Sequence, residues 1–549
     1  MPLQKNQVLT LQVERLSSDG SGVAHSPEGE TVFIPGAAPG DEARVRIVKD
    51  CKRYAFGILD EVLKPSPDRI PVDCAVAGPC GGCSLRHLDY AAELRAKQEN
   101  VADAFARIGG LDVPVLPIVG SPEIDRYRNK VQFPVGTDKA GRPCIGFYAG
   151  RTHRIVPCPD CRLQPGVLNE IGNTLCAFFA EKGIHPYNEE TGKGLVRHIF
   201  LRRGAHSGQI MVCLVCTRAK IPSADELCTR LKEAFPDIVT ILLNVNAKNT
   251  NVILGSETHT LYGQGYIEDT LCGVPVQLGP LSFYQVNTLA AEQLYGIAAE
   301  YAQLTPDDLL LDLYCGMGTI GLSMADHCRE LVGVEIVPEA IESAKANAAR
   351  MGAAVSAKSR FFCADAGQAA AQLAAEGLHP DVVMLDPPRK GCDEATLSAV
   401  VRMAPRRVVY VSCNPATAAR DAAWLEQNGY HAEKVQPVDL FPRTKHCETV
   451  VLLSKGEIDS KKVRVEFSLE DMDMSEFQDG ATYPQIKEYV LEHTGLKVSN
   501  LYISQIKRKC GLEVGKNYNL PKSEDSRQPQ CPPEKEKAIR EAFKYFGMI

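Results

Sequence analysis

The stretch LLLDLYCGMGTIGLSMA, residues 309–325, decides the fold of the larger part of this chain. Its apolar first half predicts a buried parallel strand, and the glycines after it predict a tight turn into a helix. Asp312, Gly316, Gly318 and Gly321 occur in an order that lets the backbone approach a ligand closely, as in nucleotide-binding α/β folds. A glycine-rich loop alone is weak support, so the strands that follow it matter more.

Each of the next predicted strands ends in a polar residue. LVGVEI places Glu335 at a second strand end, where a carboxylate can accept hydrogen bonds from ribose hydroxyls. FFCAD places Asp365 at a third strand end and DVVMLDPPRKG places Asp386 at a fourth. Because ligands bind at the carboxyl ends of strands in open α/β sheets, this pattern predicts a methyltransferase core that binds S-adenosylmethionine. A dinucleotide oxidoreductase is less favoured, because the DPPR and SCNP segments have no role there.

One cysteine stands at such a strand end. VVYVSCNPAT, residues 408–417, predicts a buried strand that stops at Cys413. Most cysteines of this chain are expected to fill cores as small apolar side chains. At the edge of the sheet where ligands bind, we interpret Cys413 as a reactive group.

Length and composition set outer limits. A chain of 549 residues suggests three or four domains, and 44% hydrophobic with 23% charged residues is typical of a soluble protein. Because it has no apolar run of about 20 residues and no signal-peptide pattern at MPLQKNQVLT, we expect a cytoplasmic protein without a membrane partner. In that compartment, 20 cysteines favour metal ligation, catalysis or packing over disulfides. A net charge of -7 gives no global nucleic-acid signal.

The N-terminal part differs from the core. Residues 7–63 are short alternating segments broken by glycine and proline, which predicts a five-stranded barrel of the OB type, and PSPDR at 65–69 predicts a linker. A cysteine-rich loop follows, with Cys74, Cys80 and Cys83, and Cys158 and Cys161 come later. Thiolates on such a loop can converge on one centre, and their spacing fits zinc or an iron-sulfur cluster equally.

The segment from Arg126 to Arg154 is locally basic, with seven basic residues against one acid, Asp138. Cations interleaved with aromatic rings suit phosphate contacts and base stacking on single-stranded RNA, and a solvated sheet face is an equal alternative. The aromatic residues concerned are Tyr127, Phe133, Phe147 and Tyr148.

The C-terminal residues 459–549 carry a different pattern. A polar linker precedes a predicted strand at 463–473, and two amphipathic helices then flank a Thr-Gly turn, the second capped by Ser499 or Asn500. A last helix closes the chain. This helical module suits a helix-turn-helix-like unit that binds nucleic acid or docks another protein. Its second helix carries Lys507, Arg508 and Lys509.

Taken together, the motifs resemble the RNA uracil-5 methyltransferase family, RumA/TrmA type, over residues 1 to about 456. They are F-x-Q-x-N (Phe283, Gln285, Asn287), DLYCGMGTIGL, LDPPRKG, SCNP and TKHCETVVLL. The resemblance implies a multidomain chain with a Rossmann-like class I methyltransferase core. Its expected parts are a TRAM-like β-barrel (1–65), a cysteine cluster loop (66–98), a linking helix with a basic β-rich RNA-binding domain that also supplies Cys161 (99–280), the core (281–456) and the C-terminal extension (459–549).

The resemblance also implies site residues. A [4Fe-4S] cluster, favoured over zinc, would be bound by Cys74, Cys80, Cys83 and Cys161; Cys161 fits better than Cys158, because the family's cysteine follows an Ile-Val pair, here Ile155-Val156. S-adenosylmethionine would be bound by Gln285, Tyr314, Thr319, Glu335, Asp365 and Asp386.

The family's chemistry gives three residues catalytic roles. C5 of uracil is a weak nucleophile, so the Cys413 thiolate would first add to C6, with its pKa lowered by the sulfonium and by strand-end dipoles. Glu448 would then remove the C5 proton, and burial would raise its pKa toward neutrality. Asp386 would orient the uracil or the cofactor amine.

We therefore expect a monomeric enzyme that methylates C5 of a uridine in RNA. 23S rRNA is favoured, because the transfer-RNA branch usually lacks the barrel and the cluster cysteines. Two alternatives stay open, a transfer-RNA uracil-5 methyltransferase and a non-catalytic iron-sulfur RNA-binding protein. A DNA or cytosine methyltransferase is disfavoured by the barrel and by DPPR in place of an NPPY-type edge.

Overall fold

The computed structural model describes residues 3–150, 152–248, 250–456, 483–494, 496, 498–510, 531–546 and 548. The chain divides into two compact units, residues 1–458 and 459–549, which are described separately. Within the described residues, no helix combines the length and the apolar character that a membrane span requires.

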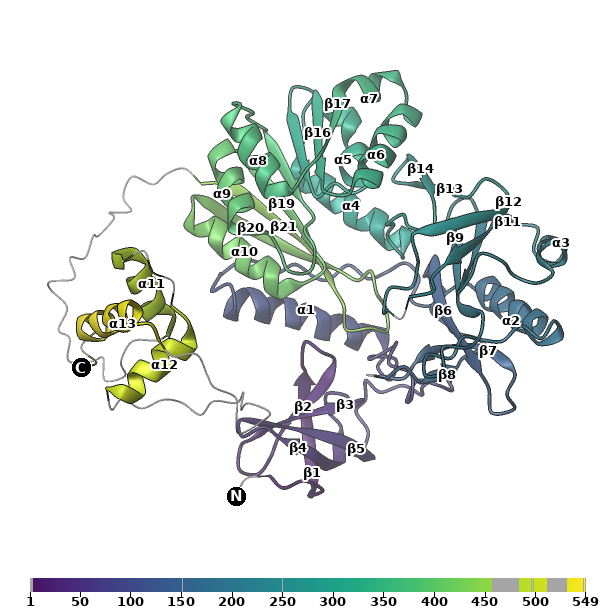
Figure 1. The fold of residues 1–549 in the computed structure, drawn as a ribbon, viewed down its shortest axis with the longest axis horizontal. Coiled ribbons are helices and arrows are strands. Elements are labelled where there is room, and N and C mark those ends of the chain that lie inside the picture. Colours follow the sequence, from purple (N-terminus) through teal and green to yellow (C-terminus); the bar gives the residue numbers. More distant parts are fainter. Residues whose placement is uncertain are drawn as a thin grey trace. The chain divides into compact units, whose positions relative to one another are not determined.

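The chain begins with a closed five-stranded barrel, as predicted (Figure 1). Alternate residues such as Val32, Ile34, Val45 and Ile47 point inward and are fully buried, because successive side chains of a strand face opposite sides. The strands are β1 (Val8–Leu16), β2 (Ser21–His25), β3 (Thr31–Pro35), β4 (Glu42–Asp50) and β5 (Tyr54–Lys64), in the order β1-β2-β3-β5-β4.

The central part is a seven-stranded sheet covered by two helices. Its strands are β6 (Lys130–Thr137), β7 (Pro143–Tyr148), β8 (Ile155–Pro157), β9 (Val196–Arg203), β10 (Ile210–Cys216), β11 (Ile238–Val245) and β12 (Glu257–Tyr262), in the order β12-β11-β10-β9-β6-β7-β8. The helices are α2 (Gly166–Glu181) and α3 (Ala224–Ala234), and a hairpin of β13 (Ile267–Leu271) and β14 (Val274–Leu278) leads onward.

The last part of the first unit is an α/β core around a second seven-stranded sheet. The sheet order is β17-β16-β15-β18-β19-β21-β20, with β15 to β19 parallel and β20 and β21 antiparallel. Its strands are β15 (Leu309–Leu313), β16 (Glu330–Glu335), β17 (Ser359–Cys363), β18 (Val382–Leu385), β19 (Arg407–Ser412), β20 (Tyr430–Val438) and β21 (Glu448–Lys455).

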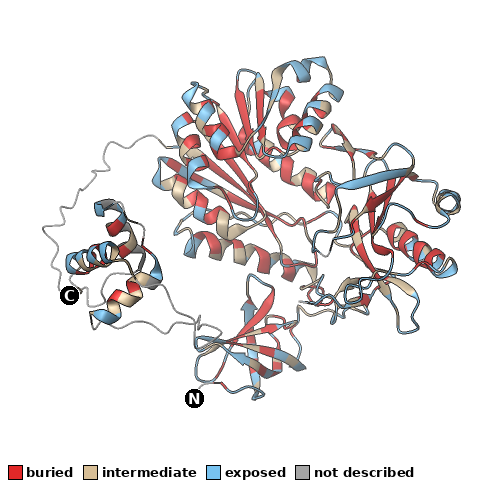
Figure 2. Cartoon of the chain, viewed as in Figure 1, coloured by how far each residue is buried: buried red, intermediate tan, exposed pale blue. Residues whose placement is uncertain are grey.

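Helices cover both faces of this sheet, and the central strands β15, β18 and β19 are almost entirely buried, whereas the edge strand β17 is partly exposed (Figure 2). Leu310 faces one hydrophobic core, while Leu311 and Leu313 face the other. The helices are α4 (Thr288–Ala302), α5 (Thr319–Ser323), a 3-10 turn (Ala325–His327), α6 (Pro338–Arg350), α7 (Ala353–Lys358), α8 (Ala366–Ala375), α9 (Glu394–Met403) and α10 (Pro415–Gln427). This doubly covered sheet confirms the predicted methyltransferase-type core.

Helix α1 (Tyr90–Arg107) packs on this core although it precedes the central sheet in the chain. Asp89 caps it by accepting a hydrogen bond from the Ala92 amide at 2.8 Å, and Phe105 is buried in the core shared with α10. Val115 and Val119 then run parallel to β20 through bridges to Val435 and Val438. The chain between α1 and the central sheet is thereby attached to the core's edge.

The second unit contains three described helices around their own apolar core: α11 (Tyr483–Thr494), α12 (Asn500–Lys509) and α13 (Pro533–Tyr545). Ser499 caps α12, because its hydroxyl accepts a hydrogen bond from the Tyr502 amide at 3.3 Å. The predicted strand at 463–473 lies outside the described residues.

Candidate active site

The strand ends of the core bring Cys413, Glu448 and Asp386 to one edge of the sheet. β18 and β19 are parallel, so Asp386 and Cys413 both follow a strand's carboxyl end. β21 runs antiparallel to β19, and Ser412 pairs with Thr449, whose hydroxyl donates to the Ser412 carbonyl at 3.2 Å. The next residues along each strand, Cys413 and Glu448, therefore emerge side by side.

Burial controls the charges at this edge. Glu448 is only 5% exposed, and burial followed by the neighbouring Asp386 raises its pKa to about 8. Burial also raises the pKa of Asp386 to about 7. Glu448 therefore has the raised pKa expected for it, which suits a group that takes up a proton near neutral pH.

Groups of opposite charge act on the Cys413 thiol. Its pKa is raised, first by partial burial and then by the Glu448 carboxylate. Arg389 acts in the opposite direction on both Cys413 and Glu448. The chain's own groups therefore raise the thiol pKa on balance, whereas the effect expected of the cofactor's sulfonium stays a prediction. Sequence reasoning missed Arg389, although it belongs to the quoted DPPR motif.

The loop that holds Arg389 is tied to the start of α10. Asn414 caps α10, and its side-chain amide donates to the Arg389 carbonyl at 3.0 Å. The Thr417 hydroxyl donates to the same carbonyl at 3.3 Å. The residues after Asp386 and those after Cys413 are therefore held together by direct hydrogen bonds.

The glycine loop surrounds a buried carboxyl group. Asp312 is 1% exposed, and its Oδ2 accepts a hydrogen bond from the Gly321 amide at 3.0 Å. A Cβ at Gly321 would lie 2.8 Å from that oxygen, so only glycine permits the approach. The Asp312 Oδ1 is buried without a hydrogen-bond partner, and burial raises the Asp312 pKa to about 8. An orphaned acceptor beside a glycine loop fits a ligand that supplies a donor.

The other predicted cofactor residues occupy the same edge of the sheet. Glu335 ends β16 and accepts hydrogen bonds from the Gly316 amide at 3.1 Å and from the Val337 amide at 3.0 Å. Asp365 caps α8 by accepting from the amides of Gly367 and Gln368.

Three further predicted cofactor residues stand beside the glycine loop and before α4. Tyr314 directly follows β15 with φ 66°, a left-handed conformation that non-glycine residues rarely adopt. Thr319 begins α5 and lies 3.3 Å from the Tyr295 hydroxyl. Gln285 precedes α4, and its carbonyl accepts from the Asn129 side chain at 2.7 Å.

The five predicted cluster cysteines line one cavity of about 250 Å³. Cys158 and Cys161 both line it, and a hydrogen bond between their side chains lowers the pKa of Cys161 to about 7, whereas burial raises that of Cys83 to about 11. Among the described residues, no three potential ligands stand close enough together to hold one metal ion. The cations that also line the cavity are Arg86, Arg128, Lys130 and Arg162.

The basic segment from Arg126 to Arg154 places two of its four aromatic rings in the interior. Tyr127 is 6% exposed and donates its hydroxyl to the Pro442 carbonyl, and Phe133 is fully buried. Arg126 is paired with Asp160, and Arg128 lines the cysteine cavity. Phe133 belongs to the core between β6 and α2, whereas Phe147 and Tyr148 are only partly buried. RNA stacking by this segment therefore stays a prediction.

Comparisons with known proteins agree with this architecture. Residues 277–456 match the family model described as tRNA (Uracil-5-)-methyltransferase, and residues 2–59 match the TRAM domain. An uncharacterized RNA methyltransferase of Halalkalibacterium halodurans is 43% identical over 453 residues, which is 82% of this chain and 98% of the relative. The chain belongs to the RNA uracil-5-methyltransferase family.

Two further relatives match more than four-fifths of this chain. An uncharacterized RNA methyltransferase of Clostridium tetani is 40% identical and matches 83% of this chain and 98% of its own length. A solved structure, the Pyrococcus abyssi tRNA (uracil-54, C5)-methyltransferase in complex with S-adenosyl-L-homocysteine, has 27% identity and a TM-score of 0.65. It covers 81% of this chain and 100% of that chain. This chain is therefore an S-adenosylmethionine-dependent RNA methyltransferase.

Proposed function

We propose that this enzyme methylates C5 of a uridine by covalent catalysis, with Cys413 as nucleophile and Glu448 as base. The observation that carries the proposal is the pairing of β19 with β21, which sets Cys413 beside Glu448 at the ligand-binding edge, next to Asp386. A nucleophile and a base at adjacent strand positions are the two groups that C5 substitution of uracil requires.

The steps follow from the properties of the three side chains. The Cys413 thiolate forms an S–C bond to C6, and the displaced π electrons make C5 nucleophilic as an enolate. After C5 has gained its methyl group, the Glu448 carboxylate takes the C5 proton. The C5–H electrons then re-form the C5=C6 bond, and the thiolate leaves. Asp386, which faces Glu448, holds a hydrogen-bonding group of the uracil or of the cofactor in place.

S-adenosylmethionine supplies the electrophilic methyl group. We assign its binding to the glycine loop with Tyr314 and Thr319, together with Glu335, Asp365, Asp386 and Gln285. The orphaned Asp312 Oδ1 and the closely approached Gly321 support this assignment.

A [4Fe-4S] cluster is our proposal for the cysteine cavity, which Cys74, Cys80, Cys83 and Cys161 all line. All-thiolate ligation suits zinc as well as an iron-sulfur cluster, and the resemblance to the family favours the cluster. The cations lining the cavity would balance the charge of the thiolates.

The substrate is RNA, and we propose 23S rRNA as the substrate of a monomeric, cytoplasmic enzyme. The cysteine cavity beside the barrel supports this choice, since the transfer-RNA branch usually lacks both. Transfer RNA is the second candidate, because the solved relative that is covered over 100% of its length is a tRNA (uracil-54, C5)-methyltransferase.

Two variants test the chemistry. Cys413→Ala should abolish methylation while S-adenosylmethionine still binds, and normal turnover by this variant would refute the mechanism. Glu448→Gln should form the bond to C6 but resolve it slowly, so a covalent protein–RNA adduct should accumulate on denaturing gels. A Glu448→Gln enzyme that turns over normally without adduct would remove Glu448 from the base role.

Two further measurements test the cofactor and the substrate. Cys83→Ala should lower the iron content of anaerobically purified protein, and unchanged iron would argue against the cluster. Mapping of 5-methyluridine in ribosomal and transfer RNA from a deletion strain should show its loss from 23S rRNA alone.

A further inference from the structure

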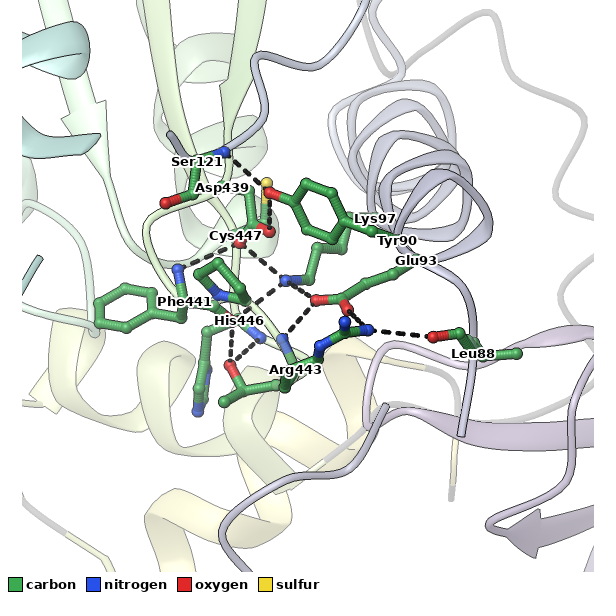
Figure 3. Close-up of polar contacts among 12 residues, drawn as sticks. Leu88, Tyr90, Glu93, Lys97, Ser121, Asp439, Phe441, Arg443, His446 and Cys447 are labelled. Atoms are coloured by element: carbon green, nitrogen blue, oxygen red, sulfur yellow. Dashed lines mark hydrogen bonds and ion pairs between the residues drawn. The ribbon is translucent and has the colours of Figure 1, made fainter. Parts of the chain in front are cut away.

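A cluster of buried charges joins α1 to the segment that leads into Glu448 (Figure 3). The Lys97 side chain is 2% exposed and those of Glu93 and Asp439 are fully buried. The Lys97 Nζ lies 2.8 Å from Glu93 Oε1 and 2.8 Å from Asp439 Oδ1. Tyr90, also on α1, donates its hydroxyl to Asp439 Oδ2 at 3.0 Å.

The contacts continue along the segment between β20 and β21, residues 439–447, which we call the base loop because Glu448 follows it. Lys97 also donates to the Phe441 carbonyl at 3.2 Å. The Arg443 amide donates to Glu93 Oε1 at 2.7 Å, and its guanidinium donates to the Leu88 carbonyl at 3.0 Å. The base loop is thus attached to α1 at three successive points along its length.

Arg443 shows that the base loop is held in one conformation. Its φ is 69°, in the left-handed region that costs a bulky residue conformational energy. Such a backbone persists only where surrounding contacts fix it, and here the Glu93 carboxylate and the Leu88 carbonyl do so. The strained backbone of Arg443 therefore depends on contacts from α1 as well as on the base loop itself.

Buried ion pairs of this kind are weak contributors to stability. The free-energy cost of desolvating two charges is about as large as the gain from their attraction, so replacing a buried pair by apolar residues often leaves protein stability unchanged or raises it. What such pairs do enforce is geometry, because a displaced partner leaves an unpaired buried charge. Two cations and two carboxylates, Lys97, Arg443, Glu93 and Asp439, are matched here within one interior cluster.

The base loop ends at the catalytic edge. Asp439, the first residue of the base loop, directly follows β20, and Cys447, its last residue, directly precedes Glu448, which pairs with Val438. A shift of Asp439 relative to α1 would therefore be transmitted to the first residue of β21. His446 connects the two regions electrostatically, since burial, Arg389 and Lys97 all lower its pKa, to about 4.

We propose that Lys97 is a positioning residue for the proton-abstraction step, which fixes Glu448 beside Cys413 by fastening the base loop to α1. The inference rests on the proposed role of Glu448. It assigns a task in the reaction to a helix that precedes the catalytic sheet by some two hundred residues in the chain.

The test compares adduct with product. In Lys97→Met the nucleophile remains in place and the base is displaced, so the covalent protein–RNA adduct should form at a near-normal rate. Its resolution to methylated RNA should slow by about ten- to a hundredfold, as expected for misplacement of a catalytic group by roughly 1 Å. The adduct fraction per folded enzyme should therefore rise, as in Glu448→Gln.

Milder variants keep the test meaningful if Lys97→Met folds poorly. Lys97→Met combined with Asp439→Asn leaves no extra buried charge, and Tyr90→Phe removes only one hydroxyl; both should raise the adduct fraction. Arg95→Met is the matched control, because Arg95 lies on the same helix but pairs with Asp68 at the surface. Its adduct fraction should equal that of the unaltered enzyme.

Three results would overturn the inference. If adduct and product fall together in the Lys97 variants, in proportion to the folded fraction measured by circular dichroism, the cluster only stabilises the fold. If Glu448→Gln accumulates no adduct while retaining turnover, the proposed function of Glu448 fails and the positioning role fails with it. An adduct with Glu448→Gln but not with the Lys97 and Tyr90 variants refutes positioning alone.

Discussion

At the residue scale, two buried carboxyl groups share the site with one thiol. Burial raises the pKa of Asp386 to about 7, and burial followed by the neighbouring Asp386 raises the pKa of Glu448 to about 8. Near neutral pH the pair keeps a proton, and Arg389 is the cation that offsets its charge at Glu448. The base is therefore poised to accept a proton only as the pH approaches its pKa.

The raised pKa of Glu448 predicts how the rate of adduct resolution depends on pH. A carboxyl with a pKa of about 8 is mostly protonated below that pH, and only its carboxylate form can remove the C5 proton. The resolution rate should therefore rise about tenfold per pH unit up to roughly pH 8 and then level off. Rapid-quench measurement of preformed adduct at several pH values checks this, and a flat profile from pH 6 to 9 would contradict it.

Arg389 gives a second prediction at this scale. Its charge lowers the pKa of both Cys413 and Glu448, so Arg389→Met should raise both values and slow adduct formation at pH 7 several-fold. Increasing the pH should recover much of the loss, and Arg389→Lys should retain most of the rate. Lys390→Met is the control on the same loop. An unchanged rate and pH profile for Arg389→Met would exclude the electrostatic role.

That Cys413 and Asp386 lie at one edge of the sheet could be predicted from sequence, whereas the buried contacts around them could not. Cys413 and Asp386 follow apolar runs that can only be buried strands, and parallel strands bring their ends to one edge. Lys97 and Asp439 are 342 positions apart, and a fully buried lysine is too rare to be expected from pattern alone. Their pairing depends on how α1 docks on the core, which no local periodicity encodes.

At the scale of elements, the barrel carries an aromatic surface that the sequence pattern did not reveal. Phe33 on β3 pairs with Phe56 on β5, and Tyr54 lies 5.7 Å from each ring. Tyr54 is 41% exposed, and Lys52 and Arg53 beside it are exposed as well. Rings flanked by cations suit stacking of unpaired bases with phosphate contacts.

Tyr54→Ala should therefore weaken RNA binding. One lost stacking contact corresponds to about 1–3 kcal/mol, or roughly a 5- to 150-fold higher Kd. Ile58→Ala is the matched control, since Ile58 is an exposed apolar residue on the same strand. Filter binding at one fixed salt concentration compares the two. Equal affinities would show that this face of the barrel does not contact RNA.

The segment from Arg126 to Arg154 shows why a charge pattern alone cannot separate an RNA surface from a strand that packs on a core. An alternating cation–aromatic pattern is produced both by an exposed RNA surface and by a strand with one face in a core. Phe133 lies in that core, whereas Tyr54 lies outside the barrel, and both read alike as aromatic residues in strands. Only packing against α2 distinguishes them.

At the scale of the whole molecule, the cysteine cavity draws on distant parts of the chain. Cys80 forms a backbone bridge with Ala149 of the central part, and cysteines of both segments line the same cavity. Leu85 donates its amide to the carbonyl of Arg443 in the base loop at 3.0 Å. A cluster bound in this cavity would therefore be connected, through the cysteine loop and this hydrogen bond, to the base loop that precedes Glu448.

The second unit is the part that the curated relatives do not match. Relatives covered over 98% of their length match only 82–83% of this chain, and the family match ends at residue 456. The first unit contains the barrel, both large sheets and every residue assigned to the chemistry. The second unit has its own apolar core around Ile486, Ile503 and Phe543.

A chain ending at Ile458 should therefore fold and methylate RNA at a rate within about twofold of the full-length enzyme, because its hydrophobic cores are complete without the second unit. If the basic end of α12 contacts RNA, the truncated chain should show a higher Kd and a shallower dependence of Kd on salt. Reversal of Arg508 to Glu in the full-length chain should then reproduce part of that change. Equal Kd values at every salt concentration would instead assign the second unit to binding a protein partner, while loss of methylation by the truncated chain would show that the two units are not independent.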